Sequence, residues 1–550
     1  MIGNADRRFD PNSVRHMYPA VWPQWPFNEP PKVREQSQPI YSIHAETDVW
    51  IPMRDGVRLA ADIYRPRSAG QKFPALLAIS PYTRGLQLTE VAIGQNEAGL
   101  TEFWVPRGYV HIIVDCRGTN DSEGVFDNRG PIEQKDFVEL IHWAASQPWC
   151  NGSVGMAGCS YFSLVQFLSA IHQPEPLKAI FPYDSWTDKY RHLYYPGGIP
   201  QTGYMWMWFS AMSNLLFNSG RQRDRAGVEK MMREGMGFEH PFDGEHYREV
   251  SPQPHMHKVR IPTYFGSDWS FYWDHLPGVF AGWEGATNAP KRMLVGPRPQ
   301  PWRPYGSYHQ EALRWYDQWL KGMDTGAMEG PPIQLYIQGE NTWRGEVEWP
   351  LARAEWRKFH LGGPGGGPVG MLSDSSGAEG SRSYVNDPLS REWRYGRPRL
   401  VYRSEPLSQA LEVTGPLALH LAARSSAQDT DWIVTLHDEA PDGATRLLTR
   451  GCLRASHREL DEKLSRPGRP WHPHTRSVPL APSHVEVFEI EIVPTSNVFL
   501  PGHRVRIEVG SCASAVDRVA YLDTLPIRAE NTVIEGGRDG SYLLASVVPR

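Results

Sequence analysis

The stretch from residue 155 to residue 170, GMAGCSYFSLVQFLSA, constrains the fold of this chain most strongly. Up to Ala157 it continues a short apolar run that is typical of a buried parallel strand, whereas beyond Ser160 the apolar residues recur at helical spacing. This change of period predicts a strand, a tight turn at Ser160 and a helix. The pattern Gly-Cys-Ser-Tyr-Phe at residues 158–162 matches a nucleophile elbow whose last glycine is replaced. The alternative is a serine that only caps a buried helix.

The sequence on both sides of this stretch predicts a doubly wound parallel sheet. An amphipathic helix is expected at residues 133–146, and buried strands are expected at residues 73–80, 110–115, 261–266 and 291–296. Alternating strands and helices are typical of the α/β class, in which ligands bind at the carboxyl ends of the strands. Ser160 follows such a strand end, so we expect the functional site there.

The pattern changes along the chain in a way that predicts several domains. Beyond residue 330, short alternating strands separated by Gly and Pro predict an all-β sandwich, whose first strand is expected at residues 333–338. An aromatic and Met-rich region that includes YMWMWF at residues 204–209 predicts a helical insertion over the strand ends. The expected parts are an irregular N-terminal arm (1–45), an α/β domain (46–185 and 258–325), a helical cap (186–257) and the sandwich (330–550).

The composition argues against several classes of function. The chain of 550 residues has a formal net charge of -5, which provides no basic surface for nucleic acid. Its first residues contain no apolar core of a secretory signal, and no apolar stretch reaches the length needed to span a membrane. The five cysteines are scattered and include no Cys-x-x-Cys pair, which argues against a disulfide framework or a zinc site and favours a cytoplasmic location.

No cofactor or metal is expected, because the sequence contains no His-Glu-x-x-His, P-loop or dinucleotide-binding motif. The expected partner is a small organic substrate, since the chain has 21 Trp residues and Trp is well suited to line a pocket for such a ligand. The sandwich and the cap also offer surfaces through which the chain could form a homo-oligomer.

Several motifs together resemble one family of enzymes. Besides the elbow, they are PMRDG at residues 52–56, DCRG at residues 115–118, DTD at residues 429–431 and TSNVFLPGHR at residues 495–504. They are similar to motifs of the cocaine-esterase-like (CocE/NonD) hydrolases, relatives of the X-Pro dipeptidyl-peptidases. The resemblance implies an α/β-hydrolase domain with a helical cap insertion and a C-terminal jelly roll. It also implies cleavage of esters or amides by a Ser-Asp-His triad.

The resemblance assigns three parts of such a site. Ser160 matches the nucleophile, the backbone N–H of Tyr161 matches one oxyanion donor, and the hydroxyl of Tyr82 matches the second. The other two triad positions depart from the family pattern, because Phe271 stands at the position of the Asp and Gln300 at that of the His. A glutamine cannot accept the serine proton near neutral pH, and a phenylalanine cannot orient an imidazolium.

Other residues of the same region are candidates for the missing roles. His275 and His309 are candidate bases, and Asp268 and Asp274 are candidate carboxylates to orient them. Aromatic residues of the cap and of the loop after the strand at 261–266 are expected to line the substrate pocket; they are Trp206, Trp208, Phe209, Trp269 and Phe271.

Three functions stay open on these observations. The first is an acyl ester or amide hydrolase whose base has moved. The second is a non-hydrolytic enzyme on this scaffold, such as a cyclase, a lyase or an acyl-transfer catalyst, in which Ser160 and Tyr82 form hydrogen bonds without a covalent step. The third is a binding protein without catalytic activity.

Overall fold

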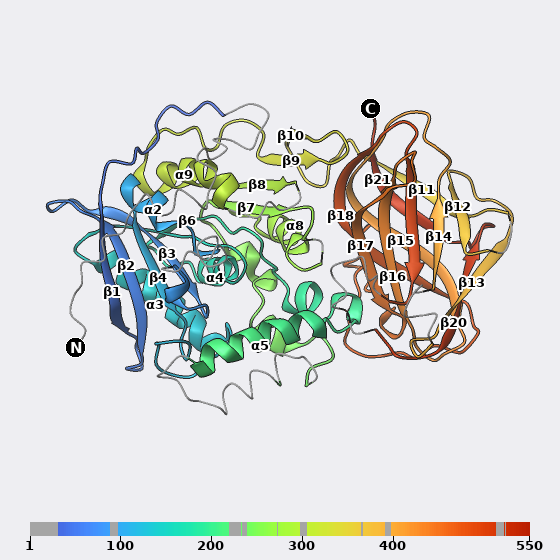
Figure 1. The fold of residues 1–550 in the computed structure, drawn as a ribbon, viewed down its shortest axis with the longest axis horizontal. Helices are drawn as coiled ribbons and strands as arrows, with labels where there is room; N and C mark the ends of the chain where they lie inside the picture. Colours follow the sequence, from blue (N-terminus) through green and yellow to red (C-terminus); the bar gives the residue numbers. More distant parts are fainter. Residues whose placement is uncertain are drawn as a thin grey trace.

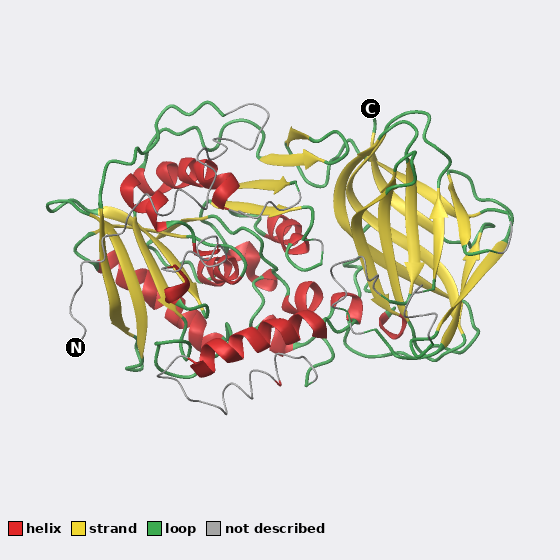
Figure 2. Ribbon diagram, in the orientation of Figure 1, coloured by secondary structure: helices red, strands yellow, loops and turns green. Residues whose placement is uncertain are grey.

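The structure is a computed structural model that describes residues 31–87, 97–218, 233, 239–271, 273–297, 305–364, 367–390, 398–512, 522 and 524–550. These residues form two lobes, an α/β lobe that runs from the blue to the yellow part of the chain and an all-β lobe whose colours run from yellow-orange to red (Figure 1). Helices are concentrated in the first lobe, and strands fill the second (Figure 2). Gln300 and residues 1–30 of the expected arm lie outside the described residues.

The first lobe is built on a ten-stranded sheet with the order β1-β2-β4-β3-β5-β6-β7-β8-β9-β10. Its strands are β1 (Ile43–Pro52), β2 (Arg58–Pro66), β3 (Phe73–Ser80), β4 (Val110–Asp115), β5 (Cys150–Met156), β6 (Leu177–Ile180), β7 (Thr263–Asp268), β8 (Lys291–Gly296), β9 (Ile333–Ile337) and β10 (Thr342–Glu346). Neighbours from β4 to β9 are parallel, and antiparallel strands stand at both edges. The expected doubly wound sheet is therefore confirmed.

Helices flank this sheet. They include α2 (Thr101–Trp104), α3 (Pro131–Ser146), α4 (Tyr161–Ala170), α8 (Leu276–Gly285) and α9 (Tyr305–Lys321). The helix expected at residues 133–146 is confirmed as α3, and its apolar positions Phe137, Leu140, Ile141 and Ala144 are buried. Every residue of α4 is buried, so the helix after the elbow is packed on all sides.

A long helix, α5 (Thr202–Asn218), lies in the region expected to form the cap. It crosses the lower side of the first lobe in Figure 1 and points toward the second lobe. Met205, Phe209 and Met212 of α5 are buried in the core of the first lobe, so one apolar side anchors the helix. The short elements around it are η4 (Lys189–Tyr194), η5 (Pro196–Gly198), α7 (Glu245–Arg248) and η6 (Gln253–Lys258).

The strand that we expected to open the sandwich belongs instead to the α/β sheet. β9 pairs in parallel with β8, and β10 follows it as an antiparallel edge strand. Alternate residues of β9 are fully buried and half-buried. The prediction of a sandwich that begins at residue 330 is therefore wrong for β9 and β10, because a strand near the edge of a mixed sheet shows the same alternation as a sandwich strand.

The second lobe is an eleven-stranded all-β structure with the order β13-β20-β15-β18-β17-β16-β19-β14-β12-β11-β21, and a pairing of β21 with β15 brings the sheet back on itself. Its strands are β11 (Glu355–Gly362), β12 (Val369–Ser373), β13 (Gly380–Asn386), β14 (Arg399–Arg403), β15 (Leu411–Ser425), β16 (Asp431–Glu439), β17 (Thr445–Arg454), β18 (Glu486–Phe499), β19 (Arg504–Gly510), β20 (Ala529–Glu535) and β21 (Tyr542–Val548). Trp432 and Phe488 belong to its separate apolar core. The expected all-β half is confirmed.

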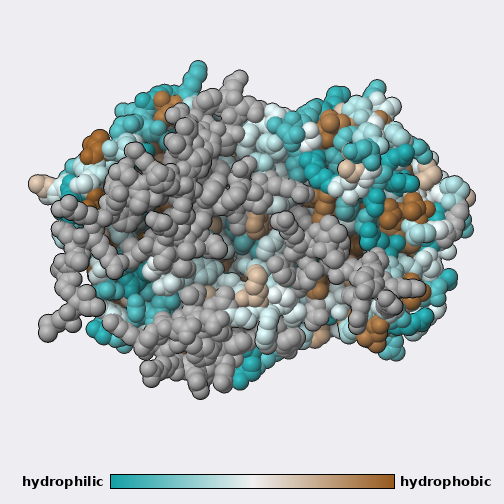
Figure 3. Space-filling model, viewed as in Figure 1, coloured by the Kyte–Doolittle hydropathy of each residue, from teal (hydrophilic) through white to brown (hydrophobic). Residues whose placement is uncertain are grey.

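Backbone pairing and side chains join the two lobes. The Gln338 N–H donates to the Ser496 carbonyl at 3.2 Å, and the Val498 N–H donates to the Gln338 carbonyl at 2.8 Å. Arg469 of the second lobe forms an ion pair with Glu284 of α8. The space-filling view shows a waist between the two lobes, with mainly hydrophilic and neutral residues on the described surface of that face (Figure 3).

Candidate active site

Ser160 stands at the turn between β5 and α4 in a backbone conformation that few residues adopt. Its φ is 58° and its ψ is -118°, and holding a non-glycine residue in such a region costs on the order of 1–3 kcal/mol. Two hydrogen bonds fix this conformation, because the Ser160 N–H lies 3.1 Å from the Tyr183 carbonyl oxygen and 2.9 Å from that of Asp184. The side chain forms no capping hydrogen bond to α4, a fully described helix, so the alternative of a helix-capping serine is wrong.

Close packing inside the turn requires the glycine two residues before Ser160. Gly158 has a φ of 124°, and a Cβ atom at this position would lie 2.2 Å from the Cβ of Phe162. Phe162 occupies the last position of the elbow pattern, where glycine is usual. Its ring packs against the ring of Tyr82 with centroids 6.0 Å apart. The replacement therefore fills the space between the turn and the segment after β3.

Tyr82 and Trp208 come together beside the elbow. Tyr82 follows β3, and the indole Nε1–H of Trp208 from α5 donates to its hydroxyl at 3.1 Å. The rings of Trp208 and Tyr161 are nearly parallel, with an interplanar angle of 7° and centroids 6.4 Å apart. Burial, together with the charge of Glu97, raises the pKa of Tyr82. Because Trp208 supplies the donor and the phenol stays protonated, the Tyr82 hydroxyl keeps its own proton for another acceptor.

A buried arginine completes the aromatic surroundings of the elbow. Arg129, in the loop between β4 and α3, is only 4% exposed. Its guanidinium carbon lies 4.8 Å from the ring centre of Tyr161, 4.9 Å from that of Trp186 and 5.9 Å from that of Trp208. These are distances of cation–π contacts. A positive charge is therefore held against the side chain of the residue that follows Ser160.

Glu133 of α3 links this arginine to Tyr161. Its carboxyl group accepts hydrogen bonds from the Arg129 N–H at 2.6 Å and from the Tyr161 hydroxyl at 3.4 Å. Burial raises the pKa of Glu133 to about 8, although the Arg129 N–H acts in the opposite direction. This carboxyl group is therefore mainly protonated at neutral pH and contributes little negative charge.

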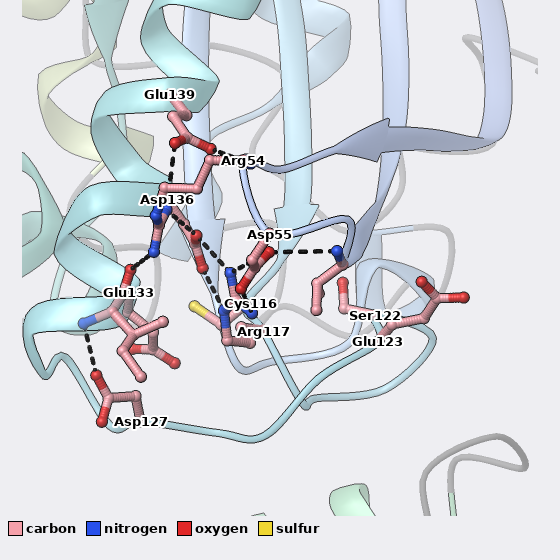
Figure 4. A network of polar contacts seen from close by, with 12 residues as sticks. Arg54, Asp55, Cys116, Arg117, Ser122, Glu123, Asp127, Glu133, Asp136 and Glu139 are labelled. Atoms are coloured by element: carbon pink, nitrogen blue, oxygen red, sulfur yellow. Dashed lines mark hydrogen bonds and ion pairs between the residues drawn. The ribbon is translucent and has the colours of Figure 1, made fainter.

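Ion pairs fix the same helix from the other side. Figure 4 shows Glu133 on α3 beside Asp136, which pairs with both Arg54 and Arg117. Arg54 belongs to the turn of the hairpin formed by β1 and β2, and Arg117 follows β4. The network therefore ties α3 to the hairpin turn and to the loop that carries Arg129.

The predicted carboxylate candidates lie at or just after the carboxyl end of β7. Asp268, the last residue of this strand, is buried and accepts hydrogen bonds from the N–H and the hydroxyl of Ser270. Asp274 is also buried, and its Oδ1 lies 3.3 Å from Nδ1 of His275. Phe271, at the position expected for the family Asp, packs against the ring of His275 with centroids 5.4 Å apart.

The pair of Asp274 and His275 stands at the start of α8, close to the segment that holds Ser160. A Cβ atom on Gly278, in the first turn of α8, would lie 2.2 Å from the Ser185 carbonyl oxygen. Ser185 directly follows Asp184, whose carbonyl accepts the Ser160 N–H. The helix that begins after His275 therefore abuts the chain beside the elbow.

The remaining candidates point to other parts of the first lobe. His309 of α9 packs against Phe103, with ring centroids 4.5 Å apart, on the side of α2. Trp269 is buried, and its Nε1–H donates to the Tyr336 carbonyl of β9 at 2.7 Å. Trp206 is 56% exposed and Phe209 is fully buried. Among the five expected pocket residues, Trp208 is the one that hydrogen-bonds to Tyr82.

Sequence reasoning missed Asp184, Arg129 and Tyr204. Asp184 has a φ of 53°, is fully buried and accepts a hydrogen bond from the Ser267 hydroxyl at 2.7 Å. It lies just beyond the carboxyl end of β6 (Leu177–Ile180), where the rule that sites form at strand ends could have found it. Tyr204 packs against Trp273 with ring centroids 5.1 Å apart. Arg129 lies in a loop, for which no periodic signal exists.

A cavity of 380 Å³ lies where η4, α8 and the second lobe meet. Trp273, which contacts Tyr204, lines it together with Arg191, Cys452 and Trp471. None of the five expected pocket residues is among the described residues that line it. The cavity therefore borders the surroundings of Tyr204 through Trp273.

Two further findings concern the described ranges alone. Within them, no three or more His, Cys, Asp or Glu side chains gather in a group that could hold a metal ion. No helix within them combines the length and the apolar character needed to cross a membrane.

A parallel α/β sheet with a strained serine at the turn after β5 defines the class of serine hydrolases with the α/β-hydrolase fold. The family model of the X-Pro dipeptidyl-peptidase (S15 family) matches residues 55–299, and that of the X-Pro dipeptidyl-peptidase C-terminal non-catalytic domain matches residues 325–544. The cocaine esterase of Rhodococcus sp. (strain MB1 Bresler) is 30% identical over an alignment that covers 84% of this chain and 90% of that protein. The chain therefore belongs to the cocaine-esterase-like (CocE/NonD) hydrolases, relatives of the X-Pro dipeptidyl-peptidases.

More distant relatives agree with this assignment. A putative Xaa-Pro dipeptidyl-peptidase of Streptomyces avermitilis is 22% identical, with 90% of this chain and 84% of that protein covered. A CocE/NonD family hydrolase from Staphylococcus aureus has a similar structure, with a TM-score of 0.81, 22% identity and coverage of 92% of this chain and 93% of that one. An α-amino acid ester hydrolase gives a TM-score of 0.74 at 20% identity, with 94% and 98% covered. The resemblance inferred from the motifs is thus confirmed, and the chain is a hydrolase of the serine esterase and peptidase type.

Proposed function

We propose that the protein hydrolyses an ester or amide through an acyl-enzyme formed on Ser160. The hydroxyl attacks the substrate carbonyl, the leaving group departs with a proton, and water then releases the acyl group. The observation that carries the proposal is the strained backbone of Ser160, which two carbonyl groups hold in place although the side chain does not cap α4. Backbone strain of this kind clusters at functional sites.

Two groups beside Ser160 are suited to bind the oxyanion. Tyr161 is the first residue of α4, so its N–H has no acceptor within the helix, and the helix dipole favours negative charge at this end. The Tyr82 hydroxyl accepts a hydrogen bond from Trp208, so its own proton is left to be donated to the oxyanion. Removing one donor from an oxyanion site typically costs about 3 kcal/mol of transition-state stabilisation.

For the proton acceptor we propose His275, with Asp274 as its partner. The support is the 3.3 Å separation of His275 Nδ1 and Asp274 Oδ1, and the packing of α8 against Ser185 next to the elbow. Phe271 cannot replace the orienting carboxylate. His309, packed against Phe103 on the side of α2, has no comparable support.

The proposal is tested with a fluorophosphonate probe and mass mapping of the labelled residue. We expect labelling of the parent protein at Ser160 and none in Ser160→Ala. Ser163→Ala is the matched control, because Ser163 is a buried serine on the same helix, and this variant should be labelled like the parent. A parent protein that stays unlabelled, or labelling that survives Ser160→Ala, contradicts the acyl-enzyme.

The proposed base has its own test. His275→Gln should lower the rate of labelling by about 10²-fold or more, the lower range for loss of a general base. His309→Gln, a second buried histidine of the same lobe, should label at close to the parental rate. A low labelling rate for His309→Gln and a parental rate for His275→Gln would assign the base to His309.

A non-hydrolytic reaction at the same site is the second candidate. It is favoured by one observation, that the Ser160 hydroxyl forms no hydrogen bond to any residue in the described part of the chain, a bond that a general base would accept. In this candidate Ser160 and Tyr82 only stabilise charge on the substrate. Turnover by Ser160→Ala at close to the parental rate would support it and contradict the acyl-enzyme.

A further inference from the structure

The loop that carries Arg129 is fixed at several points. Asn128 and Arg129 both have a positive φ, of 45° and 71°, which is uncommon for residues other than glycine. The Ile132 N–H donates to the Asp127 carboxylate at 2.9 Å, so the end of the loop is bound to the first turn of α3. Arg117, near the start of the loop, pairs with α3 as well (Figure 4). The guanidinium of Arg129 is therefore placed before any ligand arrives.

The guanidinium of Arg129 uses few of its five N–H groups. Nη2 donates to Oδ1 of Asn128 at 2.7 Å, and Nε donates to the Asn128 carbonyl at 3.3 Å. Among the described residues, these two bonds to Asn128 are the hydrogen bonds that the guanidinium donates, and the carboxyl group of Glu133 accepts from the Arg129 backbone N–H and not from the guanidinium. Hydrogen-bonding capacity that matches a planar carboxylate therefore remains available.

The positive charge of Arg129 is also incompletely neutralised. Arg84 and Arg117, the buried arginines that precede it in the sequence, each form ion pairs with two or more carboxylates. Glu133, which accepts the Arg129 N–H, is mainly protonated at neutral pH because burial raises its pKa to about 8. The faces of Tyr161, Trp186 and Trp208 stabilise the cation but add no counter-charge.

This charge lies within electrostatic reach of the groups beside Ser160. Burial raises the pKa of the hydroxyls of Tyr82 and Tyr204, and the charge of Arg129 acts in the opposite direction on both. Glu97 and Asp274 supply negative charge near Tyr204. An anionic group of a ligand is therefore drawn toward Arg129 and away from these two carboxylates.

We propose that Arg129 binds a carboxylate of the substrate, so that the substrate is an ester or amide carrying a free carboxylate near the bond that is cleaved. Arg129 is only 4% exposed beside the rings of Tyr161, Trp186 and Trp208, and a charge-assisted pair shielded from solvent is stronger than one in water. The inference rests on the proposed function in one respect, because it takes Ser160 as the reacting group beside Tyr161, the ring that Arg129 contacts.

Binding is measured in Ser160→Ala protein, so that no turnover occurs. The probes are monomethyl esters of straight-chain dicarboxylic acids from succinate to suberate, and the matching dimethyl esters serve as neutral counterparts in isothermal titration calorimetry. We expect at least one monomethyl ester to bind about tenfold or more tightly than its dimethyl ester, as one hydrogen-bonded charge pair allows. Equal affinities for all pairs overturn the proposal.

Variants of Arg129 separate recognition from a structural role. Adding Arg129→Gln should remove the preference for the anion and leave the affinity for the dimethyl ester unchanged. Arg58→Gln, at an exposed arginine paired with Glu123, should keep the full preference. A preference that survives Arg129→Gln, or an equal loss for both esters, overturns the proposal. If Arg129→Gln does not fold, Arg129→Lys decides, because an ammonium lacks the planar fork: the preference should fall at least about threefold, and an unchanged preference overturns the proposal.

The outcome is distinguishable from failure of the proposed function. An anion preference without fluorophosphonate labelling would reject the acyl-enzyme and keep the carboxylate site. Labelling at Ser160 without an anion preference would keep the acyl-enzyme and reject the carboxylate site.

Discussion

At the scale of single residues, the elbow depends on glycine at position 158, which has no side chain, and on phenylalanine in place of glycine at position 162. Gly158 leaves free the space in which the Cβ of Phe162 lies. Phe162 in turn packs on Tyr82, the proposed oxyanion donor. The two positions compensate each other, so the exchange of glycine for phenylalanine at the end of the elbow pattern is tolerated only with glycine at position 158.

Gly158→Ala should therefore damage both stability and labelling. The new Cβ would add an overpacking cost of about 1–3 kcal/mol to the backbone strain. Gly152→Ala is the matched control, because Gly152 has a φ of 90° but nothing within 4 Å of an added Cβ. Thermal unfolding should show the larger fall for Gly158→Ala, and the double variant Gly158→Ala/Phe162→Gly should recover part of the labelling. Equal falls in the two single variants would contradict this account.

The protonated Glu133 makes stability depend on pH. Burial raises its pKa to about 8 from an ordinary value of 4.5, the charges of Asp127 and Asp136 act in the same direction, and Arg129 acts against them. Because the folded-state pKa is the higher one, the folded protein retains a proton that the unfolded chain releases between these values. Stability from this group is thus present at low pH and declines as the pH rises through this window.

Glu133→Gln should remove this part of the pH dependence. The neutral amide can still accept the Arg129 N–H, so the melting temperature of the variant relative to the parent should rise between pH 5 and pH 8, by an amount that reflects on the order of a few kcal/mol. Glu123→Gln is the control, since Arg58 lowers the pKa of the exposed Glu123 and its titration lies below this window. Parallel curves for Glu133→Gln and the parent would contradict the assignment.

At the scale of elements, α5 gives the site its aromatic wall. Trp206 and Trp208 stand two positions apart on this helix, and only Trp208 contacts Tyr82 and Tyr161, whereas Trp206 is mostly exposed. The orientation of α5, fixed by the burial of Met205 and Phe209, therefore decides which tryptophan reaches the elbow.

Trp208→Phe should lower the reactivity of Ser160 without destabilising the protein. Phenylalanine keeps an aromatic face against Tyr161 but loses the N–H that donates to Tyr82, a bond worth about 1 kcal/mol. We expect a fall of about fivefold in the rate of fluorophosphonate labelling, with little change in melting temperature. Trp206→Phe should label like the parent. A Trp208→Phe variant as active as Trp206→Phe would show that the hydrogen bond does not matter.

Much of the fold could be predicted from periodicity. The strands at residues 73–80, 110–115 and 291–296 match β3, β4 and β8, because a fully buried parallel strand leaves an uninterrupted apolar run. β9 was assigned to the sandwich, since its half-buried pattern does not say which sheet it joins. Local pattern therefore predicts an element well and its partner strand poorly.

The candidate site could be predicted less completely. Ser160 was found because a change of period marks a turn, whereas Asp184, just beyond the carboxyl end of β6, was missed. Arg129 and the choice of Trp208 over Trp206 depend on a loop conformation and on the rotation of a helix, which no short-range pattern encodes. Gln300, the residue at the expected histidine position, lies outside the described residues.

At the scale of the whole molecule, Arg191 of η4 connects the two lobes. Its guanidinium pairs with Asp188 and Asp243, and it donates to the His472 carbonyl of the second lobe at 3.0 Å. The guanidinium also stacks 4.1 Å from the ring centre of Trp471. The lobes are therefore expected to unfold together.

Arg191→Gln should uncouple the unfolding of the two lobes. Removal of the cation leaves two largely buried carboxylates without their partner, which costs about 3 kcal/mol or more. In differential scanning calorimetry we expect a lower transition temperature or a split into two transitions. Arg403→Gln, at an exposed arginine that pairs with Glu439 inside the second lobe, is the control. A thermogram of Arg191→Gln that matches the control would contradict the coupling.

The short run of chain from Tyr183 to Gly198 has a consequence for engineering by domain exchange. At one end its carbonyls hold the Ser160 N–H, and at the other the Cys452 thiol donates to the Pro196 carbonyl at 3.3 Å. A Cβ atom on Gly197 would lie 1.9 Å from the Cys452 carbonyl oxygen. A chimaera that takes its C-terminal domain from a relative should therefore inherit this run from the same donor, since a mismatched graft would misplace the carbonyls that hold the Ser160 N–H.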